Sequence, residues 1–91
     1  MIYKIIYAPK AELDLAQLQA NEPKAYKKAL ELIAELYEHP QTGTGHPEMF
    51  KGDPKGRWSR RITKKHRLVY RILDETVIVL VLKAYGHYDD K

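Results

Sequence analysis

The sequence predicts an α+β fold in which a pair of helices packs against one β-sheet. Three observations support this prediction. They are a β-rich segment at the start of the chain, two stretches of helical periodicity separated by Asn21-Glu22-Pro23, and three strand-like segments at hairpin spacing after residue 57. The expected order of elements is β-α-α-β-β-β. With 91 residues, 44% of them hydrophobic, the chain is expected to form one domain that covers residues 1–91.

The first half of the chain contains the N-terminal strand and both helices. Ile2–Tyr7 is rich in β-branched and aromatic residues, which is typical of a strand. Pro9 suits the first turn of a helix, where its missing N–H is not needed, and this helix is expected to run to about Ala20. A second helix begins near Pro23 and ends before His39-Pro40, because a residue that precedes proline is disfavoured in the α region. Its core-facing side is expected to contain the apolar residues at three- and four-residue steps: Tyr26, Ala29, Leu30, Ile33, Leu36 and Tyr37.

The second half is expected to be a loop followed by an antiparallel meander. Gln41–Pro47 contains two glycines and a proline, so we expect a loop there. The predicted strands are Trp58–Ile62, His66–Leu73 and Thr76–Ala84, and the links between them are short enough for hairpins. Val77–Leu82 is apolar without alternation, which is typical of a strand in the interior of a sheet.

The basic residues are concentrated in one part of the chain. Between Lys51 and Arg71 there are nine Lys or Arg residues and one acid, Asp53, so the local net charge is +8, whereas the whole chain carries +4. A localised cationic surface indicates a polyanionic partner. The alternative is an ordinary solvated sheet face whose charges limit aggregation.

Several other kinds of site are excluded by the composition. The chain has no cysteine, which excludes disulfides and thiolate zinc sites and favours a reducing compartment, the cytoplasm. The N-terminus does not have the pattern of a signal peptide, and no apolar run approaches the roughly 20 residues of a membrane span. His46 and Glu48 form an H-x-E motif like that of zinc deaminases, but those enzymes also need cysteine ligands. The four histidines are scattered, so neither a metal site nor another cofactor is expected.

Glu48, His87 and the arginines of the basic strands have side chains that together suit RNA cleavage. Alternation along His66–Leu73 places Arg67 and Arg71 opposite the apolar residues of that strand, on the sheet face that the helices leave uncovered. Metal-free cleavage needs a base for the 2′-OH, an acid for the leaving 5′-oxygen and cations for the charge on the phosphorane. The spacing of these residues does not by itself bring them together.

The segment GTGHPEMFKGDPKGRWSRRITKKHRLVY, followed by a terminal GHY, resembles the YoeB/Txe branch of the RelE-like toxins of bacterial type II toxin–antitoxin systems. The match is close from Gly43 to Tyr70 and resumes at His87-Tyr88. The resemblance implies a curved antiparallel sheet covered on one face by an αα-hairpin. It also implies a cytoplasmic endoribonuclease, an mRNA interferase, that cuts mRNA in the ribosomal A site without a metal and so inhibits translation.

The resemblance also implies a role for each matching residue. Glu48 of the PE motif would be the general base on the 2′-OH. Arg67 of HRLVY would stabilise the transition-state phosphate, and His87 would be the general acid. The residues that bind or place the substrate would be Lys51, Arg61 and Tyr88.

The partners implied by the resemblance are a cognate YefM/Axe-like antitoxin, the ribosome with its mRNA, and a second copy of the chain in a homodimer. The antitoxin would wrap the toxin and block or distort the site, operator DNA would be bound only through the antitoxin, and no membrane would be involved. Two alternatives stay open. One is an RNA- or ribosome-binding translation inhibitor that does not cleave. The other is a DNA-binding regulator, which is disfavoured because no helix-turn-helix with a basic recognition helix is present.

Overall fold

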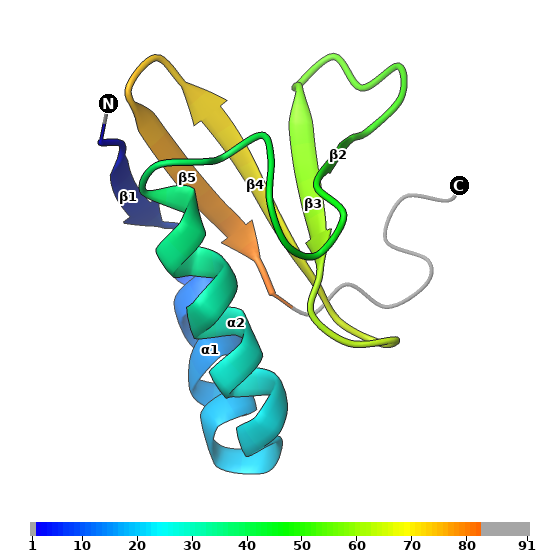
Figure 1. Cartoon of the computed structure of the whole chain (residues 1–91). Helices are drawn as coiled ribbons and strands as arrows, with labels where there is room; N and C mark the ends of the chain where they lie inside the picture. The colour runs from blue at the N-terminus through cyan, green and yellow to red at the C-terminus, as the bar shows by residue number, and fades with distance from the viewer. Residues whose placement is uncertain (1, 83–91) are drawn as a thin grey trace.

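The structure has two layers, a five-stranded sheet and a helical hairpin that packs on one face of it (Figure 1). The computed structural model describes residues 2–82. The elements in chain order are β1 (Lys4–Tyr7), α1 (Pro9–Asn21), α2 (Pro23–Leu36), β2 (Glu48–Met49), β3 (Arg57–Arg61), β4 (Arg67–Leu73) and β5 (Thr76–Val81). The predicted α+β class, both helices and the three C-terminal strands are confirmed. Neither helix in this part of the chain is long and apolar enough to cross a membrane.

The sheet is mixed, with strand order β1-β5-β4-β3-β2. The pairs β2–β3, β3–β4 and β4–β5 are antiparallel, which confirms the predicted meander. At the other edge β1 pairs in parallel with β5, with Ile6 beside Ile78. The expectation of a wholly antiparallel sheet is therefore wrong at this edge. Only strands joined by a short turn have to run antiparallel, and β1 reaches β5 through the rest of the chain. The two-residue strand β2 was also missed, because so short a segment shows no alternation.

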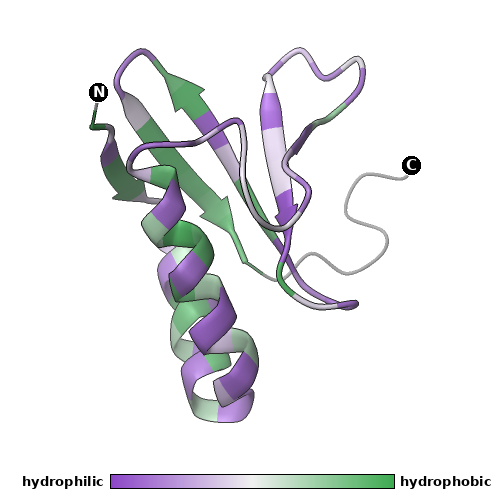
Figure 2. Cartoon of the chain, viewed as in Figure 1, coloured by the Kyte–Doolittle hydropathy of each residue, from purple (hydrophilic) through white to green (hydrophobic). Residues whose placement is uncertain are grey.

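The hydrophobic core lies between the sheet and the hairpin. Strand β5 lies inside the sheet, as its apolar run predicted, and Figure 2 shows it as mostly hydrophobic. The predicted stripe of α2 is partly wrong, because Leu30 and Tyr37 are 41% and 43% exposed. Apolar residues lie on two overlapping faces of this helix, and the face that packs on the sheet is not the predicted one. The buried residues of α2 are Ala25, Ala29, Leu32, Ile33 and Leu36.

Two buried polar side chains tie the hairpin to the sheet. Asp14 of α1 is 1% exposed, and its Oδ2 accepts a hydrogen bond of 3.1 Å from the backbone N–H of Leu82 at the end of β5. His66, immediately before β4, places Nε2 2.9 Å from Oε2 of Glu22 at the corner between the two helices. Buried polar groups are costly unless they are hydrogen-bonded, so these contacts favour one position of the hairpin on the sheet.

Candidate functional site

The sheet face that the helices leave uncovered, called here the open face, carries the predicted site residues of β2, β3 and β4. Glu48 pairs with Ser59, and Arg61 pairs with Arg67. Paired residues, and residues two apart on one strand, project from the same face of a sheet. Glu48, Arg61 and Arg67 therefore share the open face, come from three adjacent strands, and are all exposed.

Arg61 and Arg67 lie directly opposite each other on β3 and β4. Like charges in directly opposed positions destabilise a sheet, and an anion placed between them removes that repulsion. Guanidinium groups bind phosphate through parallel N–H···O bonds. The pair can therefore bind a phosphate group. Glu48 lies on β2, which is the neighbour of β3 on the side away from β4.

A β-bulge shapes the open face beside these residues. Tyr70 pairs with Val79 and Val69 pairs with Val81, so Leu80 is an extra residue on β5. A bulge re-aims the side chains that follow it, and here Val81 packs with Val69 in a second, smaller cluster, against which Phe50 and Leu80 also pack. The centre of the open face therefore has an apolar floor next to the charged residues.

The loop between β2 and β3, residues 50–56, is organised around Asp53. Its carboxylate accepts hydrogen bonds from the backbone N–H of Lys55 at 3.3 Å and of Arg57 at 2.9 Å, and from Arg57 Nε at 2.8 Å. The side-chain hydrogen bond from Arg57 is the main reason why the pKa of Asp53 lies far below its ordinary value. Lys51 is exposed in this loop, so a defined turn presents it at the β2 edge of the sheet.

Arg60 does not belong to the cationic surface. Alternation groups it with Trp58 and Ile62, and it is 0% exposed on the core side of β3, with Nη1 2.7 Å from Oε1 of Glu35 on α2. Arg57 is paired with Asp53, the acid already subtracted in the count of +8. The burial of Arg60 therefore makes the cationic surface smaller than the +8 counted along the sequence. The Arg60–Glu35 pair was missed because its members are 25 residues apart, and only the alternation of β3 pointed to a buried Arg60.

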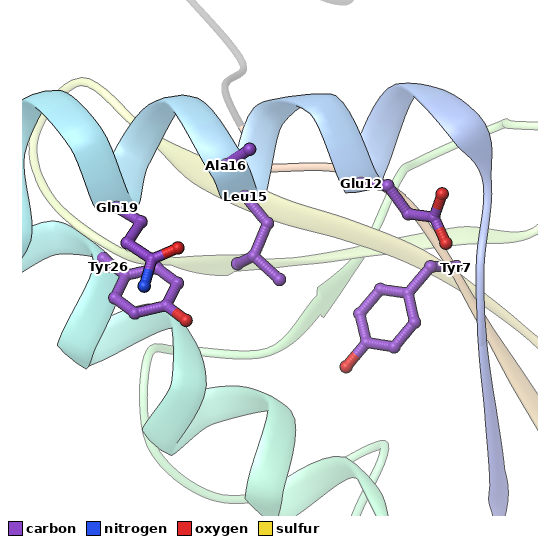
Figure 3. Close-up of a pocket in the computed structure, with 6 residues that line it drawn as sticks. All are labelled: Tyr7, Glu12, Leu15, Ala16, Gln19 and Tyr26. Carbon is purple, nitrogen blue, oxygen red and sulfur yellow. The ribbon is translucent and has the colours of Figure 1, made fainter.

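A hollow of about 370 Å³ lies elsewhere, beside the hairpin (Figure 3). Figure 3 shows Tyr26 and Gln19 at one end of it, Tyr7 and Glu12 at the other, and Leu15 between them. Burial, together with the nearby phenols of Tyr37 and Tyr26, raises the pKa of Tyr7. The residues that line this hollow are Tyr7, Glu12, Leu15, Ala16, Gln19 and Tyr26. None of them is a predicted site residue, so the open face stays the candidate site.

Two of the predicted site residues, His87 and Tyr88, lie outside the described residues. The other four, Glu48, Lys51, Arg61 and Arg67, are all exposed. Among residues 2–82 no three His, Cys, Asp or Glu side chains gather as they would around a metal ion. The described part of the candidate site therefore consists of one carboxylate and three cations.

The fold, a sheet covered on one face by an αα-hairpin, is shared with toxins of bacterial toxin–antitoxin systems. The structure is similar to that of the YoeB dimer from Staphylococcus aureus, with a TM-score of 0.80 and 33% identity over 91% of this chain and 97% of that one. It is also similar to the toxin in the heterotetrameric YoeB–YefM toxin–antitoxin complex from the same species, with a TM-score of 0.77, 33% identity and the same coverage of both chains.

The sequence comparisons agree with the structural ones. The model of the YoeB-like toxin of bacterial type II toxin–antitoxin systems matches residues 7–88. Toxin YoeB of Escherichia coli K12 is 37% identical over 82 residues, which cover 90% of this chain and 98% of that protein. The chain belongs to the YoeB-like toxin family, which confirms the resemblance seen in the PE, WSRR and HRLVY motifs.

Proposed function

We propose that this toxin is a ribosome-dependent endoribonuclease that cuts mRNA in the A site without a metal. The observation that carries the proposal is the exposed Glu48 on the same face as the opposed Arg61 and Arg67. A surface that only binds RNA gains nothing from a carboxylate beside its arginines, because the carboxylate repels phosphate. A reaction that needs a base next to a phosphate-binding pair does gain from it.

In the proposed reaction Glu48 accepts the proton of the 2′-hydroxyl. The 2′-oxygen forms a bond to the adjacent phosphorus while the bond from phosphorus to the 5′-oxygen breaks. His87 donates a proton to that leaving oxygen, so the products carry a 2′,3′-cyclic phosphate and a 5′-hydroxyl. Arg61 and Arg67 hold the non-bridging oxygens as negative charge develops on them. Lys51 adds a further positive charge, and Tyr88 helps to place the substrate.

The proposed partners follow from the relatives. The Staphylococcus aureus toxin forms a heterotetrameric complex with YefM, and a YoeB dimer from that species is also similar to this chain. We propose that this chain likewise pairs with a YefM-like antitoxin and with a second copy of itself in the cytoplasm. In this proposal the chain meets operator DNA only through the antitoxin.

A second candidate function is a translation inhibitor that binds the ribosome or mRNA without cutting. The opposed Arg61 and Arg67 support it, because two guanidinium groups in this position bind a phosphate whether or not a reaction follows.

Glu48→Gln separates the two candidates in a translation reaction with one defined mRNA, in which primer extension locates the cuts and end analysis identifies their chemistry. Glu75→Gln is the matched control, because it removes one negative charge from an exposed glutamate in the β4–β5 turn. The nuclease proposal predicts A-site cuts with 2′,3′-cyclic phosphate ends for the wild type and Glu75→Gln but not for Glu48→Gln. Inhibited translation with intact mRNA in every sample would leave only the binder.

A further inference from the structure

Arg60 makes an unusually complete set of hydrogen bonds. A guanidinium group has five N–H donors in a fixed planar arrangement, and five acceptors surround this one. The acceptor of Nε is Tyr70 Oη at 3.2 Å. Those of Nη1 are Glu35 Oε1 at 2.7 Å and Thr44 O at 3.2 Å. Those of Nη2 are Thr42 O at 2.6 Å and His39 O.

Three of these five acceptors are backbone carbonyls of the segment 39–45, which links α2 to β2. The same segment is held by Tyr70 Oη, which donates to Pro40 O at 2.6 Å, and by the backbone N–H of Arg61, which donates to Gly45 O at 2.7 Å. Figure 1 shows the chain running from the end of α2 across to the outer side of β3, where β2 lies. The segment forms no strand with β3, and the hydrogen bonds from the Arg60 side chain hold it in place instead.

Gly43, in this segment, leaves no room for a side chain beside the Arg60–Glu35 pair. Gly43 has a φ of +114°, and a Cβ there would lie 2.4 Å from Glu35 Oε1 and 3.3 Å from Arg60 Nη1. Partial burial favours the neutral carboxyl of Glu35, but hydrogen bonds from Thr44 and Arg60 outweigh it and lower its pKa. The carboxylate form is thus the one that faces Arg60.

The position of this cluster links it to the candidate site. Gly45, the last residue of the segment tied to β3, is separated from Glu48 by only two residues. On β3, Arg60 points into the core and the next residue, Arg61, points to the open face. Arg60 is fully buried but the Glu35 side chain is 31% exposed, and such a pair adds little net stability once the cost of desolvating the charge of Arg60 is counted, so stability alone is a weak reason for it.

We propose that Arg60, held by Glu35, is a positioning residue that fixes Glu48 relative to Arg61 and Arg67. The inference rests on the proposed nuclease function. Displacement of a reacting group by about 1 Å costs about 100-fold in rate. The contribution of Arg60 is therefore to the rate of cutting and not to the binding of RNA.

Arg60→Lys tests this role, because lysine keeps the charge but its single nitrogen cannot reach all five acceptors. The matched control is Arg57→Lys, which alters another arginine of β3 that is paired with a carboxylate. We measure the maximal cutting rate and RNA binding for each variant, alone and combined with Glu48→Gln. Circular dichroism and urea unfolding establish that each variant is folded.

Arg60→Lys is expected to bind RNA like the wild type and to cut about 10- to 100-fold more slowly. Glu48→Gln is expected to slow the Arg60→Lys enzyme less than it slows the wild type, because a Glu48 that is already misplaced contributes less to the cutting rate. In the Arg57→Lys background it is expected to cost the same factor as in the wild type. If Arg60→Lys does not fold, Glu35→Gln replaces it, since glutamine keeps an oxygen acceptor but not the charge, and the same non-additivity is expected.

Equal costs of Glu48→Gln in the wild type and in Arg60→Lys would overturn the positioning role and leave Arg60 with a role in stability only. An unchanged cutting rate in Arg60→Lys would overturn it as well. A wild type that does not cut mRNA, or a Glu48→Gln that cuts as fast as the wild type, is a different result. It would remove the proposed function, and the positioning role with it.

Discussion

Arg67 lies opposite Arg61. Because of this arrangement, removal of the Arg67 side chain is expected to lower the cutting rate without lowering the stability of the fold. Both side chains are exposed, and opposed like charges destabilise a sheet by up to about 1 kcal/mol. Arg67→Ala is therefore expected to leave the free energy of unfolding unchanged or slightly higher. In the proposed reaction the same change removes a group that stabilises the phosphorane, which typically contributes about 3 kcal/mol. A loss of that size corresponds to a cutting rate about 100-fold lower.

Two assays on the same preparations test this prediction. The cutting rate of ribosome-bound mRNA is measured at saturating toxin, and the free energy of unfolding is measured by urea titration. Arg71→Ala is the matched control, because Arg71 lies four residues away on the same strand and the same face. A cutting rate of Arg67→Ala within about threefold of the wild type would refute the role in the transition state. A clear loss of stability would refute the argument from opposed charges.

Three further predictions concern the surroundings of the site. Arg71→Ala is expected to weaken RNA binding and to make it less sensitive to salt, because one phosphate contact is lost, as a salt titration of the affinity would show. Asp14→Ala is expected to lower the free energy of unfolding by about 1–3 kcal/mol, because the buried N–H of Leu82 loses its acceptor. Asp14→Asn, which keeps an oxygen, is expected to cost less in the same urea titration, and equal losses would contradict this assignment. Asp53→Asn is expected to be less stable than the wild type at pH 7. The folded-state pKa of Asp53 is lowered, so its stabilising effect is present above its ordinary pKa of about 3.9 and is lost as the pH falls through the folded-state value. The difference between the two proteins should therefore shrink below about pH 4, and a difference that grows there would contradict the pairing with Arg57.

The sequence was sufficient for the elements whose spacing is regular. Helical steps predicted α1 and α2, and the short links between the strand-like segments predicted the antiparallel arrangement of β3, β4 and β5. Alternation also placed Arg67 on the open face, because residues that alternate with the buried residues of a strand must project from its opposite face.

Features that depend on contacts distant in the chain were not predictable in the same way. The direction of β1 depends on a neighbour 72 residues away, as in the pair Ile6 and Ile78, and no turn links the two strands. The choice between the two stripes of α2 depends on the shape of the sheet beneath it. Counting charges grouped Arg60 with the exposed arginines, although Glu35 and the carbonyls of the segment 39–45 surround it. The single-domain expectation and the roles of all the predicted site residues, Glu48, Lys51, Arg61, Arg67, His87 and Tyr88, stay predictions.

In the proposed reaction the nucleophile is the 2′-hydroxyl of the mRNA, deprotonated by Glu48. The most direct test is a defined mRNA with a single 2′-deoxy nucleotide at the A-site position that the wild type cuts, translated beside the unmodified mRNA. We expect cutting to disappear at that position while RNA binding and ribosome stalling at the codon persist. Continued cutting at the deoxy position would contradict it, because the attacking oxygen would then have to come from another source.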